Sequence, residues 1–105
     1  MRLAVISDIH GNLLALEAVL ADIAQRGCDR VVNLGDCCTS PLQPRETFDR
    51  LEALQLPTVR GNHDRWLGLH TRDKLGPAGQ YTFDALRAEQ RAALGALPAK
   101  LDLGD

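Results

Sequence analysis

Hydrophobic positions in the first sixty residues form short continuous runs separated by segments with a helical period. The runs at 2–7, 30–34 and 58–60 predict three buried strands, because strands covered on both faces carry continuous apolar residues. Between them, the apolar spacing predicts one helix after the capping residue Asn12 and a second helix that begins at Pro44. We therefore expect an α/β fold of the order β-α-β-α-β.

The rest of the chain has a less regular pattern. It predicts a short helix over 64–70, a loop at 76–79, and a longer helix over 83–97 with Thr82 as its cap. The alternation at 100–103 is typical of the start of a half-buried strand. We expect all of residues 1–105 to form one partial domain.

Polar residues follow each of the three predicted strands. They are Asp8-Ile9-His10, then Gly35-Asp36, then Gly61-Asn62-His63-Asp64. Right-handed crossovers make the strands parallel, so their carboxyl ends meet at the edge where open α/β sheets bind ligands. Alternation along a strand should also turn Asp8 and His10 to the same face. Carboxylates, an imidazole and an amide oxygen together suit hard or borderline divalent cations.

Composition and charge exclude several classes of protein. The chain has 105 residues, 45% hydrophobic and 25% charged, which is ordinary for a globular domain and not for a disordered one. The net charge of −2 gives no electrostatic footprint for nucleic acid or an anionic membrane. The apolar start is too short for a signal peptide, and no apolar run has membrane-spanning length. We expect a cytoplasmic protein.

Three cysteines, Cys28, Cys37 and Cys38, do not form a disulfide framework or a zinc knuckle. Cys37 and Cys38 are adjacent, and such a pair can act as a redox switch or a trap for soft metals. Small residues that pack inside a tight loop are the interpretation we favour.

The three polar motifs resemble those of the calcineurin-like metallophosphoesterase family, D-x-H, G-D and G-N-H-[DE]. The segment Cys37-Cys38-Thr39-Ser40-Pro41 lacks the aspartate and R-G of the protein-phosphatase branch, so the chain looks more like the small bacterial phosphodiesterase-like branch. The resemblance implies two divalent ions (manganese, iron, nickel or zinc). Asp8, His10 and Asp36 would hold the first, and Asp36 and Asn62 the second.

The resemblance also implies catalytic roles and a substrate class. His63 would contact the phosphate and protonate the leaving oxygen, and Asp64 would orient its imidazole. Asn62 and His63 would contact the substrate, a phosphomonoester, a phosphodiester or a dinucleoside polyphosphate. Independently of the resemblance, the positive charge of Arg60 is expected to attract the substrate phosphate. The metals would polarise the phosphoryl oxygens for in-line attack.

The family's later histidine motifs, H-G and G-H-x-H, do not occur in this sequence, where His10, His63 and His70 are the only histidines. We therefore expect an N-terminal half of the site, truncated before the second sheet. It should be inactive alone, hold at most one ion weakly, and self-associate through the edge near 100–103.

Two function classes remain open: a metal-dependent phosphoesterase, and a non-catalytic binding or scaffold module of the same fold. A nucleotide-binding domain is disfavoured because G-x-G-x-x-G and P-loop motifs are absent from the sequence.

Overall fold

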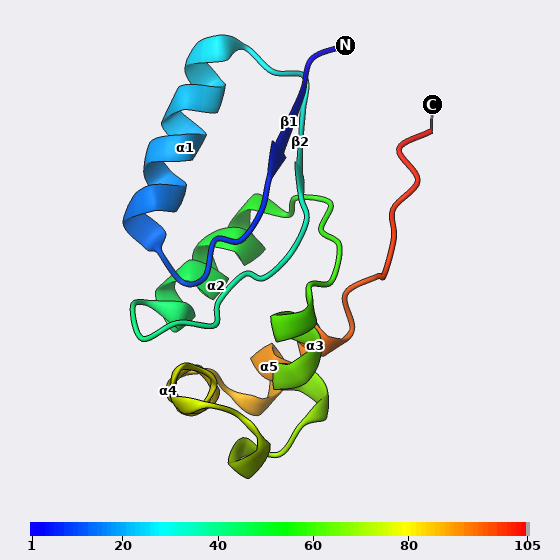
Figure 1. Ribbon diagram of the computed structural model, residues 1–105. Coiled ribbons are helices and arrows are strands. Elements are labelled where there is room, and N and C mark those ends of the chain that lie inside the picture. Colours follow the sequence, from blue (N-terminus) through cyan, green and yellow to red (C-terminus); the bar gives the residue numbers. More distant parts are fainter. Residues whose placement is uncertain (105) are drawn as a thin grey trace.

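The structure, a computed structural model, describes residues 1–104, so Asp105 at the end of the expected domain lies outside it. The described chain measures 44 × 28 × 19 Å, with the strands and the first helix at one end and the other helices at the opposite end (Figure 1). In chain order the elements are β1 (Leu3–Ile6), α1 (Leu13–Arg26), β2 (Arg30–Asn33), α2 (Pro44–Leu54), α3 (Asn62–Leu69), the 3-10 turn η1 (Arg72–Lys74), α4 (Pro77–Ala85) and α5 (Ala88–Gly95).

The sheet confirms the parallel α/β arrangement. β1 and β2 run parallel with Leu3 opposite Arg30, and α1 forms the crossover between them. The third predicted strand, 58–60, is reduced to one parallel bridge between Asn33 and Thr58. The N–H of Arg60 donates to the Pro98 carbonyl instead of extending the ladder. The chain therefore leaves the sheet as soon as it reaches the third polar motif.

The first two helices lie where the sequence predicts them. The Asn12 side chain accepts the N–H of Ala15 at the start of α1, and Gly27 ends that helix in the left-handed conformation. Pro44 stands in the first turn of α2, where its missing N–H costs nothing.

The predictions for the second part of the chain were partly wrong. Helix α3 begins at Asn62 rather than Asp64. The expected loop at 76–79 is mostly helical, because Pro77 opens α4. Residues 100–103 are not in a strand; the carbonyl of Leu103 accepts a hydrogen bond from Arg30.

The expected single helix over 83–97 is broken into α4 and α5. Leu86 and Arg87 adopt extended backbone angles between the two helices. Arg91 stabilises the break, because its guanidinium donates to the carbonyls of Phe83 and Leu86, which the interrupted helix leaves free. Thr82, the expected cap, is instead fully buried within α4, and its hydroxyl accepts the N–H of Ser40.

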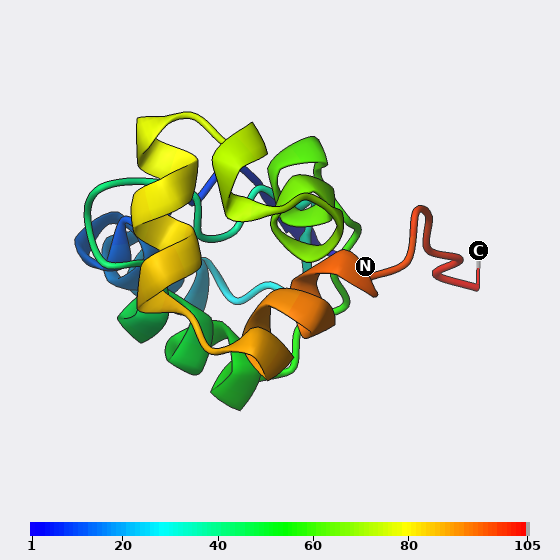
Figure 2. The ribbon, with the colours of Figure 1, turned by 90° about the horizontal axis from the view of Figure 1, so that it is seen from below.

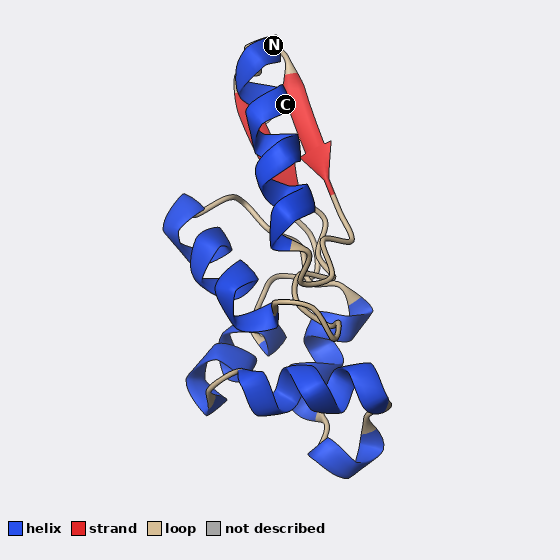
Figure 3. Ribbon diagram, turned by 90° about the vertical axis from the view of Figure 1, so that its left-hand side faces the viewer, coloured by secondary structure: helices blue, strands red, loops and turns tan. Residues whose placement is uncertain are grey.

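The core lies at the helical end of the molecule, which Figure 2 shows from below and Figure 3 from the side. Loops cross the junction between this end and the strands (Figure 3). Helices α3 and α5 approach closely, since a methyl group on Gly68 would lie 2.5 Å from the Cα of Gly95. Among residues 1–104, no helix is long and apolar enough to span a membrane. The buried apolar cluster consists of Cys37, Cys38, Phe48, Leu67, Leu86 and Leu94.

Candidate metal centre

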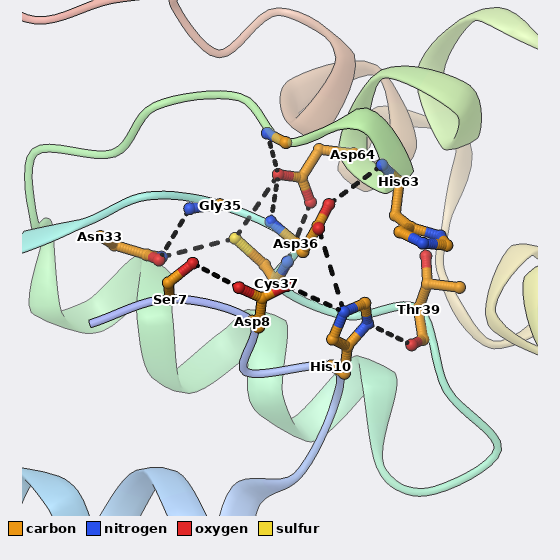
Figure 4. Close-up of polar contacts among 11 residues, drawn as sticks. Ser7, Asp8, His10, Asn33, Gly35, Asp36, Cys37, Thr39, His63 and Asp64 are labelled. Atoms are coloured by element: carbon orange, nitrogen blue, oxygen red, sulfur yellow. Dashed lines mark hydrogen bonds and ion pairs between the residues drawn. The ribbon is translucent and has the colours of Figure 1, made fainter.

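Three polar side chains from distant parts of the sequence meet at the junction between the strands and the helical end. Ligand atoms of His10, Asp36 and His63 all lie within 4.8 Å of one another (Figure 4). His10 follows β1, Asp36 follows β2, and His63 lies in the first turn of α3. The carboxyl edge of the sheet therefore collects residues from all three polar motifs, as the sequence predicts.

Asp8 and His10 come together by a different route from the expected one. β1 ends at Ile6, so strand alternation does not act on these residues. Both instead adopt left-handed backbone angles, with φ of 54° for Asp8 and 48° for His10. Their N–H groups donate to the carbonyls of Gly35 and Asp36, which ties the loop after β1 to the loop after β2. Asp8 Oδ1 then lies 3.4 Å from His10 Nε2.

The left-handed backbone is concentrated at the predicted metal ligands. Among the described residues, only four that are not glycine have positive φ, and three of them are Asp8, His10 and Asp36. The left-handed conformation costs an ordinary residue about 1–2 kcal/mol. Such strain persists where surrounding contacts enforce it, and it clusters at ligand-binding sites.

The His10 imidazole is oriented to use one particular nitrogen. Its Nδ1 lies 3.0 Å from the carbonyl of Thr39, which can only accept, so Nδ1 carries the proton. In the neutral ring, Nε2 then presents a lone pair, and it lies 3.9 Å from Asp36 Oδ2. A carbonyl that fixes the tautomer in this way is the usual support of a metal-bound histidine.

The two oxygens of the Asp36 carboxylate have different neighbours. Oδ1 accepts the N–H of His63 at 3.0 Å, while Oδ2 faces His10. The Asp8 carboxylate accepts a hydrogen bond from the Ser7 hydroxyl, which holds its pKa below the usual value. The set thus offers carboxylate oxygens and an imidazole nitrogen, a combination that fits a divalent cation.

Asp64 occupies a different position from the one expected for a partner of His63. Its carboxylate is fully buried and accepts three backbone N–H groups, from Asp36, Cys37 and Gly61. Burial raises the pKa of this carboxyl despite the three donors. Asp64 therefore fastens the loop after β2 to the start of α3. Asp64 is the third residue of α3 and accepts the N–H of Gly61 just before the helix. An acidic residue in the first turn is a sequence signal for the start of a helix.

The side chains of Asn62, His63 and Arg60 have different surroundings. Asn62 is exposed in the first turn of α3. The His63 ring meets the His10 ring edge-on, with centroids 5.1 Å apart. Arg60, expected to contact substrate, instead directs its guanidinium to the carbonyl of Gly95 at the end of α5.

Comparison with known proteins agrees with this geometry. The sequence pattern of the calcineurin-like phosphoesterase superfamily domain matches residues 1–101. The chain belongs to this superfamily. A crystal structure of a metallophosphoesterase from Sphaerobacter thermophilus is 36% identical and superposes on the whole chain with a TM-score of 0.77. The uncharacterised protein MJ0912 of Methanocaldococcus jannaschii is 38% identical over 101 residues, 91% of this chain.

This phosphoesterase domain spans less than half the length of those two relatives. It covers 44% of the Sphaerobacter chain and 42% of the Methanocaldococcus protein.

The adjacent cysteines of the phosphoesterase domain pack in its core. Cys37 is 3% exposed and Cys38 is fully buried. Burial raises the pKa of Cys37 to about 12 and that of Cys38 further, so both thiols stay protonated at neutral pH. The packing interpretation therefore agrees with the structure better than a redox or metal-trapping role does.

Sequence reasoning missed two supports of the centre. The Thr39 carbonyl that orients His10 belongs to the backbone, so no side-chain pattern can indicate it. Ser7 directly precedes Asp8 in the sequence, so a hydrogen bond from its hydroxyl to the Asp8 carboxylate could have been predicted.

Proposed function

We propose that the protein containing this domain hydrolyses phosphate esters with two divalent cations. Asp8, His10 and Asp36 would hold the first cation, and Asp36 and Asn62 would contribute to the second. The observation that carries the proposal is the strained backbone at Asp8, His10 and Asp36. Left-handed backbone at residues other than glycine clusters at ligand-binding sites, and here it falls on the three residues predicted to hold the first cation.

When bound, such cations supply Lewis-acid polarisation of phosphoryl oxygens and activation of water. The protein's own groups have separate tasks in this proposal. Thr39 keeps the His10 proton on Nδ1 and so leaves Nε2 free. The N–H of His63 holds one oxygen of Asp36. Asp64 positions both loops through backbone hydrogen bonds, so we give it a positioning role rather than that of an orienting partner of His63.

We assign the His63 side chain to the phosphate. Its backbone is anchored by Asp36, while no hydrogen bond from its ring is seen among residues 1–104. An imidazole free on both nitrogens can donate to a phosphoryl oxygen and pass a proton to the leaving oxygen. We expect the substrates to be phosphate-ester small molecules or nucleotides. The cytoplasmic location of the protein and its self-association remain predictions.

The test of the function is an activity assay of the complete protein. We would measure hydrolysis of an aryl phosphomonoester, an aryl phosphodiester and a dinucleoside polyphosphate with manganese, iron, nickel or zinc. Metal-dependent turnover of at least one substrate is expected. Inactivity on all three with every metal would support the scaffold alternative instead.

The roles of His63 and Asp36 can be separated by measuring metal content. His63→Ala should abolish turnover with metal content nearly unchanged, whereas Asp36→Ala should lose metal. Asp22→Ala, which removes an exposed carboxylate on α1, is the matched control and should change neither. Loss of metal from His63→Ala equal to that from Asp36→Ala would show that His63 is a ligand.

A further inference from the structure

A second feature lies directly beside the metal centre. A pocket of about 430 Å³ opens between α3, η1 and the start of α4. Small-molecule sites usually have volumes of about 300–1,000 Å³, so the pocket is large enough for a ligand. None of Asp8, His10 and Asp36 lines it, so it is separate from the proposed cation ligands. Residues that define its walls include Thr39, His63, Trp66, Lys74, Leu75 and Pro77.

His63 connects the pocket with the metal centre. It belongs both to the group formed with His10 and Asp36 and to the lining of the pocket. A phosphate held at His63 would therefore carry its ester group to the mouth of this pocket. The lining of the pocket extends from His63 and Trp66 in α3 to residues 77–79 at the start of α4.

The lining favours a flat ligand. Trp66 is half-buried, and its ring meets the His63 ring edge-on with centroids 4.9 Å apart. On another side it stacks on His70, with centroids 6.3 Å apart and an angle of 10° between the planes. Two aromatic neighbours thus hold the indole in place, and most of the remaining lining is apolar. A fixed indole is a stacking platform for another aromatic ring.

The pocket lining contains few polar groups, and these include a neutral hydroxyl and a positively charged amine. The Thr39 hydroxyl is a buried oxygen without a hydrogen-bond partner among the described residues. Lys74 is exposed at the pocket and offers a positive charge. An apolar pocket with a few polar groups is the usual form of a site that recognises a mainly flat, apolar molecule by its polar edge.

We infer that this pocket binds the organic group of the phosphate ester, and that this group is a flat aromatic ring. A nucleobase and a simple aryl group share this chemistry. The inference rests on the proposed function for its link to catalysis, but binding to the pocket itself does not require a bound metal.

Trp66 makes a direct test possible, because it is the only tryptophan in the sequence. We would titrate the metal-free chain with adenosine, benzyl alcohol and ribose and follow its tryptophan fluorescence. Neutral probes avoid repulsion by Asp8 and Asp36. We expect saturable quenching by an aromatic probe at concentrations at least ten-fold below any effect of ribose. Stronger binding of adenosine indicates a nucleobase, and stronger binding of benzyl alcohol indicates an aryl ester. Equal effects of all three probes, or none, would overturn the inference.

A matched pair of variants locates the binding. Trp66→Leu should weaken binding of the better aromatic probe at least ten-fold, measured by calorimetry. Tyr81→Leu removes an aromatic ring that is 50% exposed on α4 and does not line the pocket, so it should bind like the parent chain. Equal weakening by both changes would contradict the assignment.

A measurement on the unaltered chain removes any dependence on how Trp66→Leu folds. The indole N–H gives one signal in a proton–nitrogen correlation spectrum, and we expect the aromatic probe to shift it while ribose leaves it in place. If the protein hydrolyses esters but this signal does not move, the pocket inference fails alone. If the signal moves but no ester is hydrolysed, only the proposed function fails.

Discussion

The loops that follow β1 and β2 supply equivalent aspartates but hold them very differently. Asp8 and Asp36 both have left-handed backbones at the end of a parallel strand. The Asp8 side chain is 63% exposed, whereas that of Asp36 is 16% exposed and bonded to the N–H of His63. The Asp64 carboxylate also accepts the N–H groups of Asp36 and Cys37 and so fixes the loop after β2. The fold thus fixes the Asp36 carboxylate more firmly than the Asp8 carboxylate.

The largest expected loss of stability comes from a substitution at Gly35, in the loop after β2. Its φ is +98°, and a Cβ there would lie 2.5 Å from the Val59 carbonyl and would also clash with the N–H of Gly61. Gly35→Ala should lower the free energy of unfolding by more than about 4 kcal/mol. Gly27 also has positive φ but has open space around it, so Gly27→Ala should cost only about 1–2 kcal/mol. Urea denaturation measures both, and similar losses would refute the clash.

The next effect concerns the anchor of the same loop. Asp64→Ala leaves three backbone N–H groups without their acceptor and should cost about 3–5 kcal/mol of unfolding free energy. Asp22→Ala removes an exposed ion pair with Arg26 and should cost less than about 0.5 kcal/mol. If the two variants unfold alike, the buried carboxylate does not fasten the loop.

The exposed loop should show the opposite behaviour. Asp8→Asn should change the free energy of unfolding by less than about 0.5 kcal/mol, because the side chain is largely exposed. It should nevertheless weaken manganese or zinc binding about ten-fold or more, since a neutral amide replaces an ionised ligand. Asp36→Asn should affect both properties. Calorimetry and denaturation together test the contrast, and a stability loss from Asp8→Asn as large as that from Asp36→Asn would remove it.

The smallest effect is a difference in thiol reactivity. With a pKa of about 12, only about one Cys37 side chain in ten thousand is ionised at pH 8, and Cys38 is fully buried. Half-buried Cys28 should therefore react first with a disulfide reagent. The other two thiols should react only as the chain unfolds, and reactivity should rise with pH. Rapid labelling of all three thiols would show that the loop after β2 opens readily.

The fold was predictable where local signals acted alone. Asn12 and Gly27 mark the two ends of α1, and both residues lie directly beside the helix that they define. The break between α4 and α5 was not predictable, because it depends on Arg91 reaching the Phe83 and Leu86 carbonyls. The strand predicted at 58–60 was overestimated because the N–H of Arg60 donates to the carbonyl of Pro98, far along the chain, and not to the sheet.

The candidate site shows the same division. The motifs indicated His10 and Asp36, and the parallel topology explained why they meet. The sequence did not reveal that left-handed backbones, rather than strand alternation, turn Asp8 towards His10. It also did not reveal that Arg60 donates to the Gly95 carbonyl or that Asp64 accepts backbone N–H groups, because those contacts depend on α5 and on the loop after β2.

Anomalous diffraction from crystals of this chain soaked in manganese tests the central claim most directly. We expect one peak, about 2.0–2.2 Å from His10 Nε2 and an oxygen of Asp36, with Asp8 beside it. The position near Asn62 should stay empty, because Asp36 and Asn62 are the only ligands that this chain is expected to offer it. A peak on Asn62 with His10 unbound, or manganese only at exposed carboxylates such as Asp102, would contradict the account.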